Sequence, residues 1–168
     1  MPAPFDNVGR LLTRHMMYIK TIIPRLAAAA MAFVALVATA QHGPQPRLDT
    51  IELTAGMHVI RAEVAQTPAQ QSIGMMYRKE MGSNEGMLFA NAQAEVRCFW
   101  MRNTLIPLSI AFIADDGSIV NIADMQPQSD ASHCSAKPVR FALEMRRGWF
   151  ARRGIQAGFR LRGAPFRP

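Results

Sequence analysis

Residues 108–123 have the pattern of a β-hairpin, and short strands of the same kind recur along the chain. Leu108, Ile110 and Phe112 alternate with their neighbours in the two-residue period of a strand. The turn sequence Asp115-Asp116-Gly117-Ser118 follows, because Asp and Gly tolerate positive φ, and residues 119–123 lead back. An antiparallel pair of strands is therefore predicted here.

Turn residues separate further runs of alternating or apolar residues, and two short stretches have helix signals. The other predicted strands are 50–54, 58–65, 85–90, 96–101, 139–145 and 159–162. A helix is predicted from the N-cap Thr67 to about Met76, since Pro68 and Gln70 complete a capping box. A second short helix at 149–153 ends at Gly154. With no βαβ rhythm, the pattern predicts a mainly β fold, a single compact sandwich or barrel of about eight short strands with one or two short helices.

Residues 1–40 have the layout of a secretory signal peptide. Positive residues precede an apolar run at 26–38, and Ala38-Thr39-Ala40 forms an A-x-A cleavage site. The run is short against the roughly 20 residues that a bilayer-spanning helix needs. We therefore expect cleavage after Ala40 rather than an uncleaved anchor, and no stable membrane span afterwards. Translation starts at Met1, Met16 or Met17.

Cleavage would leave a lead-in with the first strand at 41–54 and a single mainly β domain at 55–168, in the periplasm or secreted. The formal net charge of the whole chain is +7, and much of it lies late in the sequence. A basic surface suits nucleic acid, but an exported protein rarely meets it, so no nucleic-acid partner is expected. A solvated basic surface or acidic envelope polymers fit this charge. The sequence leaves the oligomeric state open.

The chain has two cysteines, Cys98 and Cys134, both in the predicted mature domain. Exported thiols meet an oxidising compartment, and two cysteines allow one internal pairing. We therefore predict a disulfide between Cys98 and Cys134. Because it would close a long loop, it should stabilise the fold by about 2–4 kcal/mol.

Several motifs together resemble a known family. They include Val64-Ala65-Gln66-Thr67, Gly74-Met75-Met76-Tyr77-Arg78, Gly86-Met87-Leu88-Phe89, Phe99-Trp100-Met101-Arg102-Asn103-Thr104, Leu143-Glu144 and Gly154-Ile155. In these residues the chain resembles the domain of unknown function 192 family across residues 55–162. The resemblance implies a compact, mainly β domain that is often exported, and it implies no known reaction. The chain departs from the family pattern at Arg102, where Lys is frequent, and at Ser109, where Asp is frequent.

The polar tripeptide Arg102-Asn103-Thr104 lies between two apolar runs, and it marks the predicted ligand site. Loops at strand ends are common binding sites, and Arg offers a planar fork of donors for carboxylate or phosphate. Trp100 could stack on a sugar ring or a cation, and Arg78 follows the predicted helix. The structural alternative is that Arg102 and Asn103 bond to loop carbonyls and Glu144, with Trp100 in the core. The site hypothesis comprises Arg78, Trp100, Arg102, Asn103 and Thr104.

The main interpretation is an exported protein that binds an envelope component non-covalently, either a saccharide or an anionic group, without a cofactor. A hydrolase is the alternative, although adjacent His133 and Cys134 should point apart, and nothing in the sequence brings Glu144 and Asp116 together as a carboxylate pair. Whether the protein is an enzyme stays open. Cu(I) binding is the third hypothesis, because methionine and histidine suit that ion, yet no tight methionine group predicts a metal site.

Overall fold

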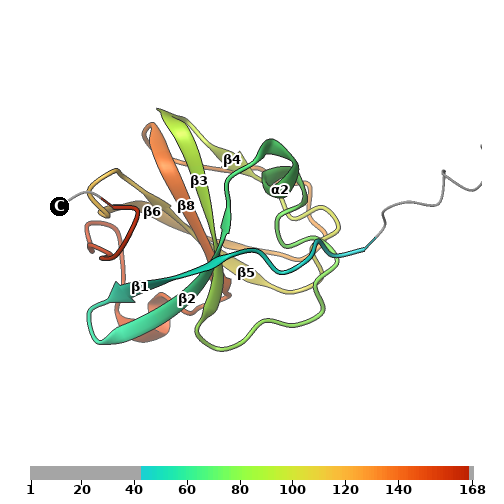
Figure 1. Ribbon diagram of the computed structural model, residues 1–168, viewed down its shortest axis with the longest axis horizontal. Coiled ribbons are helices and arrows are strands. Elements are labelled where there is room, and N and C mark those ends of the chain that lie inside the picture. The colour runs from blue at the N-terminus through green and yellow to red at the C-terminus, as the bar shows by residue number, and fades with distance from the viewer. Residues whose placement is uncertain (1–42, 167–168) are drawn as a thin grey trace, which may run out of the picture. The chain divides into compact units, whose positions relative to one another are not determined.

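The computed structural model describes residues 43–166, so the predicted signal peptide at 1–40 lies outside the described residues. One sheet has six strands and a small ribbon has two (Figure 1). The strands are β1 (Thr50–Ala55), β2 (His58–Ala65), β3 (Glu85–Glu95), β4 (Cys98–Phe99), β5 (Leu108–Ile113), β6 (Ile119–Met125), β7 (His133–Cys134) and β8 (Val139–Arg146). The helices are α2 (Pro68–Ile73) and the 3-10 turn η1 (Ala151–Arg153). The predicted mainly β fold is confirmed.

The large sheet has the strand order β1-β2-β3-β8-β5-β6, and the two strands β4 and β7 form the ribbon. The pairing is antiparallel except between β2 and β3, which run parallel. The expectation of no βαβ rhythm was therefore wrong at one place. The connection from Ala65 to Glu85 passes through α2 and is long enough for the crossover that a parallel pair needs. This crossover places α2 beside the ends of β2 and β3.

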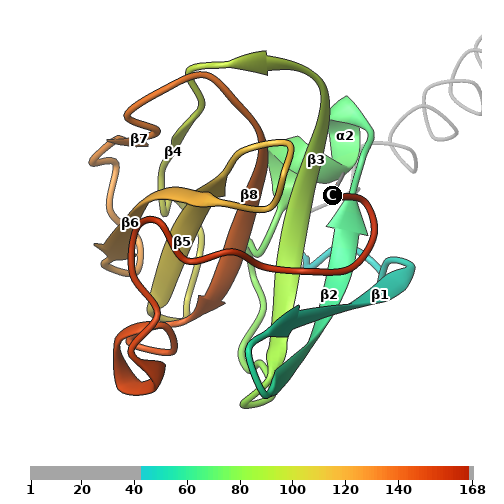
Figure 2. The same ribbon diagram turned by 90° about the vertical axis from the view of Figure 1, so that its left-hand side faces the viewer.

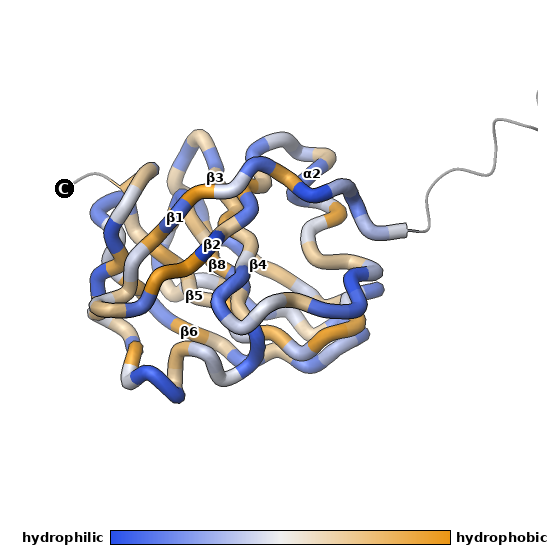
Figure 3. Tube along the Cα trace, turned by 60° about the horizontal axis from the view of Figure 1, so that its bottom comes forward, coloured by the Kyte–Doolittle hydropathy of each residue, from blue (hydrophilic) through white to orange (hydrophobic). Residues whose placement is uncertain are grey.

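Central strands are buried on both faces, which explains their nearly continuous apolar sequences. Alternate residues belong to two apolar clusters, with Leu143 and Met145 of β8 in the first and Ala142 in the second. The second cluster also holds five buried methionines, Met75, Met81, Met87, Met101 and Met125. Figure 3 shows the corresponding hydrophobic stretches along the strands and hydrophilic residues in many of the loops.

The C-terminal segment covers the first cluster and crosses one face of the sheet (Figure 2). The predicted last strand at 159–162 is not a strand. Arg162 and Arg160 form isolated bridges with Thr54 in β1 and with Ser118 just before β6. The segment thus touches both edges of the sheet instead of extending one ladder.

Other element boundaries differ from the prediction in ways that have local causes. The capping box at Thr67 is present, but α2 ends at Ile73 rather than near Met76. Gly74 takes φ 50°, and a Cβ there would lie 3.1 Å from the Phe89 ring. Of the predicted strand 96–101, only Cys98–Phe99 is a strand, since it pairs with the short β7 instead of the large sheet. None of the helices among residues 43–166 has the length and apolar character to cross a membrane.

Candidate ligand-binding pocket

A pocket of about 540 Å³ opens on the side of the sheet that carries α2 and the second apolar cluster. Its walls come from α2 and the turn after it, from the segment 97–100, and from Thr104 and Ser132. Phe89 of β3 and Glu144 of β8 also line it. This volume lies in the range of small-molecule sites.

Glu144 is the most unusual group in the pocket. It lies in the middle of β8, flanked by Met87 of β3 and Ile110 of β5, and it is buried. None of residues 43–166 donates a hydrogen bond to its carboxyl group or forms an ion pair with it. Burial raises the pKa of Glu144 to about 8, because an unpartnered charge is poorly solvated there. Glu144 therefore holds a proton at neutral pH and can donate a hydrogen bond into the pocket.

Two amide side chains in the pocket lining are held by the backbone. Gln71 donates from Nε2 to the carbonyl oxygens of Ala65 and Ala90, at 3.2 and 3.1 Å. Asn91 donates from Nδ2 to the Arg140 carbonyl at 3.0 Å. Because carbonyl oxygens only accept, these bonds define which end of each amide is the nitrogen. The amide oxygens of Gln71 and Asn91 remain as acceptors of fixed orientation.

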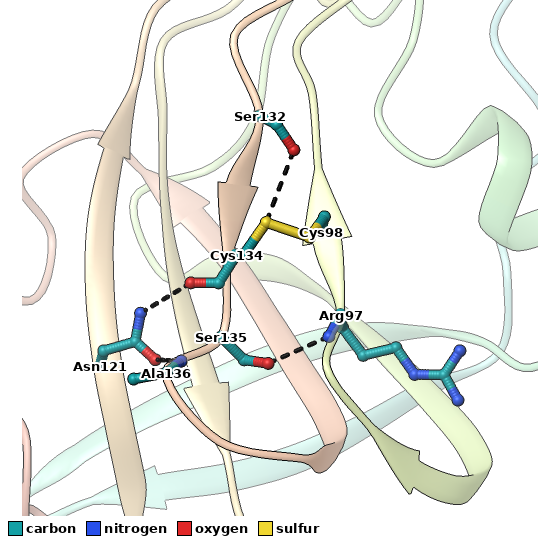
Figure 4. The surroundings of a disulfide bond; sticks show 7 residues. All are labelled: Arg97, Cys98, Asn121, Ser132, Cys134, Ser135 and Ala136. Atoms are coloured by element: carbon teal, nitrogen blue, oxygen red, sulfur yellow. Dashed lines mark hydrogen bonds between the residues drawn. A yellow bond between two sulfur atoms is a disulfide. The ribbon is translucent and has the colours of Figure 1, made fainter.

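The disulfide predicted from the sequence is present and braces one wall of the pocket (Figure 4). Cys98 and Cys134 pair directly across the β4–β7 ribbon, and Cys98 lines the pocket. Beside them, the Arg97 amide donates to Ser135 Oγ at 3.0 Å, and the Ser135 amide donates to the Arg97 carbonyl at 2.8 Å. Asn121 of β6 ties this ribbon to the large sheet by donating to the Cys134 carbonyl at 3.1 Å.

The structural alternative placed Trp100 in the core, but this residue is 50% exposed and lines the pocket. The Arg102 guanidinium lies 4.3 Å from the Trp100 ring centroid, a cation–π contact. Arg102 Nε donates to Asp130 Oδ1 at 2.8 Å, and not to Glu144 as the structural alternative supposed. Arg102 thus supports the ring of Trp100 and does not itself line the pocket.

Asn103 contributes a backbone contact near the pocket wall. Its φ of 57° is left-handed, and its carbonyl accepts from the Tyr77 amide at 2.8 Å. Tyr77 and Gln128 also have positive φ, and the Gln128 amide donates to the Thr104 carbonyl at 3.1 Å. Three left-handed residues thus join at this turn, and such strained backbone often accompanies functional sites. Thr104 is buried at the pocket wall, whereas Asn103 is outside the lining.

Arg78 is placed away from the pocket lining in a buried ion pair. Its Nη1 and Nη2 atoms donate to Glu63 Oε1 and Oε2 at 2.8 and 2.7 Å. Arg47 and the Leu48 amide donate to the same carboxyl group. Burial alone raises the pKa of Glu63, but the bonds from Leu48, Arg78 and Arg47 together hold that pKa below its ordinary value. The site that was predicted from the sequence is thus divided: Trp100 and Thr104 line the pocket, and Arg78, Arg102 and Asn103 lie outside its lining.

Sequence reasoning did not single out Glu144 as part of the pocket. A signal was available, because Glu144 interrupts the apolar sequence of a buried strand, Phe141 to Met145. The proposed partner Asp116 lies in the turn between β5 and β6, where it accepts from Ser118 and Arg160. Asp116 is not part of the pocket lining.

Comparisons with known proteins agree with this fold. A crystal structure of a proposed transcription regulator from Sinorhizobium meliloti 1021 is 35% identical, with a TM-score of 0.67, over 71% of this chain and 98% of that one. A protein of unknown function from Novosphingobium aromaticivorans DSM 12444 is 37% identical, with a TM-score of 0.67, over 75% of this chain and 94% of that one. No curated protein matches. The family model DUF192, described as "Uncharacterized ACR", matches residues 50–163, and the chain belongs to this family.

Proposed function

We propose that this chain is an exported protein whose pocket binds a small polar ligand of the cell envelope, a saccharide or a molecule with an anionic group. The observation that carries the proposal is the unpartnered carboxyl group of Glu144 in the lining of a pocket of about 540 Å³. Buried polar groups in proteins almost always have a hydrogen-bond partner. A bound ligand would supply that partner.

The rest of the lining supports the same proposal. Trp100 offers a partly exposed ring, and its contact with Arg102 limits how that ring can move. Thr104 and Ser132 carry hydroxyl groups that both donate and accept. Few polar groups among apolar ones, each in a defined place, are typical of small-molecule sites. Glycoside hydrolysis usually needs two carboxyl groups, and Glu144 is the one carboxyl residue in the lining of this pocket within residues 43–166. Binding without turnover is therefore favoured.

Export is part of the proposal, and the disulfide supports it, because such bonds persist in oxidising compartments. Because we propose export, we do not transfer the regulatory name of the Sinorhizobium structure to this chain. The test is the intact mass of the protein recovered from the envelope fraction. We expect a mature chain that begins after Ala40, and a chain that keeps residues 26–38 would contradict export by cleavage.

Ligand binding can be tested by a thermal-shift screen of envelope saccharides and phosphorylated sugars. We expect at least one compound to raise the melting temperature of the wild type, and Trp100→Ala to abolish that rise. Val96→Ala is the matched control, because Val96 is 57% exposed in the neighbouring segment and lies outside the pocket lining. The proposal fails if no compound shifts the wild type, or if Trp100→Ala responds as the control does.

A further inference from the structure

Resting on the proposed pocket function, we infer that the ligand is an uncharged saccharide unit and that Glu144 recognises it as a proton-bearing hydrogen-bond donor. The inference selects one ligand class from the two proposed above. It also assigns Glu144 as the residue that determines specificity. The geometry of the sheet and the charges around the pocket carry it.

Two buried glutamates on one face of the sheet show what is special about Glu144. Glu63 of β2 lies opposite Met87 of β3, and Met87 in turn lies opposite Glu144 of β8. The two acids therefore lie in one row across the sheet, on the strands on either side of β3. Glu63 accepts from Arg78, Arg47 and the Leu48 amide, and it is held as a carboxylate. Glu144 has none of these donors, and its flanking residues, Met87 and Ile110, are apolar. The same residue type is thus held charged at one position and neutral at the other.

The charged groups on the surrounding elements explain why a charged ligand is disfavoured. Arg97 is the other charged residue in the described pocket lining, and its Nη2 lies 3.2 Å from Glu95 Oε2. Other charged or titratable groups on this side include the pairs Arg78–Glu63 and Arg102–Asp130 and the ion pair of Arg140 with Asp115. His133, Arg146, Arg61 and the ion pair of Arg47 with Glu85 lie on this side too. Arg97 Nε has no hydrogen-bond partner among the described residues, but the Glu95 carboxylate beside Nη2 already balances the Arg97 charge. The lining therefore offers an anionic ligand little net charge to offset the cost of its desolvation. A cationic ligand would need Glu144 to ionise and would be repelled by Arg97.

An uncharged, hydroxyl-rich ring matches the uncharged polar groups and the aromatic ring of the pocket lining. Each sugar hydroxyl donates and accepts, and the lining offers both capacities. The amide oxygens of Gln71 and Asn91 accept, and the Glu144 acid donates. Thr104 and Ser132 do both, and Trp100 offers an apolar face. A protonated acid in an apolar site is a strong and specific donor for such a ring.

The test measures affinity against pH by titration calorimetry with sugars that share a ring but differ in charge. The probes are N-acetylglucosamine and glucose as neutral sugars, N-acetylmuramic acid as an anion and glucosamine as a cation, with cellobiose and maltose as neutral disaccharides. We expect a neutral sugar to bind wild type about tenfold more weakly at pH 9 than at pH 7, because the acid loses its proton near pH 8. Binding at pH 9 should take up a proton, which shows as a dependence of the heat on the buffer.

Glu144→Gln keeps the shape and a donor but cannot titrate, so we expect it to bind the neutral sugar with little change between pH 7 and pH 9. Glu95→Gln is the control for the Arg97 pair and should keep the wild-type pH dependence. The inference is overturned if affinity rises with pH, if Glu144→Gln shows the same pH dependence as wild type, or if only the anionic or cationic sugar binds. In each of those cases the proposed binding function would survive. If no sugar or phosphorylated sugar binds at any pH, both fail.

Discussion

Glu144 should affect stability in the direction opposite to an ordinary carboxylate. The folded chain keeps the Glu144 proton up to about pH 8, whereas an unfolded chain releases it near the ordinary value of 4.5. Between these values the folded state binds more protons, so the free energy of unfolding falls as pH rises through this window. The stability that Glu144 contributes is fully present below pH 4.5 and is lost above pH 8.

We therefore expect Glu144→Gln to be less pH-sensitive than the wild type between pH 5 and pH 9, and more stable than the wild type at pH 9. The difference at pH 9 should be on the order of a few kcal/mol, since each unit of pKa shift corresponds to about 1.4 kcal/mol. Urea denaturation at pH 5, 7 and 9 measures it. Parallel stability profiles for the two proteins would show that burial does not hold this proton.

Asn103 provides a second prediction at the scale of one residue, because its backbone is left-handed. Asn103→Ala should lower the free energy of unfolding by at most about 1–2 kcal/mol, because Ala has a Cβ but lacks the short polar side chain that lets Asn adopt a left-handed conformation. Asn103→Gly should be much less harmful, since Gly takes φ of 57° without strain. Chemical denaturation of both variants measures the two losses of free energy of unfolding. Equal losses would show that contacts of the Asn103 side chain, and not its backbone conformation, account for the effect.

At the scale of elements, signals carried by neighbouring residues predicted more of the structure than could be said about strand pairing far along the chain. The hairpin β5–β6 and the capping box of α2 depend on neighbouring residues, and both were predicted correctly. The parallel pairing of β2 with β3, the short strand β7 and the bridges of residues 160–162 depend on partners far along the chain. Turn and alternation patterns do not contain that information.

The candidate site shows the same division. Trp100 and Thr104 were found because they lie beside a polar interruption in an apolar sequence. Arg78 was included because it follows the predicted helix, but the fold brings it to Glu63, fifteen positions away. Glu144 comes to the pocket only through its place between β3 and β5. The register of the sheet decides which polar residue has a partner. That register cannot be read from single residues.

The disulfide makes a prediction about the β4–β7 ribbon. These strands have two residues each, too few to be stable alone, and the bond joins them across a separation of 36 residues. Replacing both cysteines with serine should lower the free energy of unfolding by about 2–4 kcal/mol. Urea denaturation with and without reductant measures this, and reductant should not destabilise the double variant further. Ser132→Ala, which alters an exposed neighbour of the bond, is the control and should change little.

At the scale of the molecule, the sheet depends on the segment after η1. Leu161 is buried in the first apolar cluster, and its amide donates to the Gly117 carbonyl at 2.9 Å. The next residue, Arg162, exchanges two backbone hydrogen bonds with Thr54 of β1, each 2.9 Å. A single short segment therefore joins the β1 edge of the sheet to the turn that precedes β6. Its loss would expose the core face and free both edges.

Leu161→Ala tests this arrangement. Removing a buried leucine side chain costs about 2–5 kcal/mol through lost burial and the cavity that remains. We expect the free energy of unfolding to fall by that amount, and amide exchange to quicken at both Thr54 and Ile119, since the segment bonds to each strand. Arg162→Ala is the matched control, because the Arg162 side chain is exposed and its bonds to Thr54 come from the backbone. The control should stay within about 0.5 kcal/mol of the wild type. If Leu161→Ala weakens protection at only one of the two strands, the segment anchors that edge alone and does not couple the two.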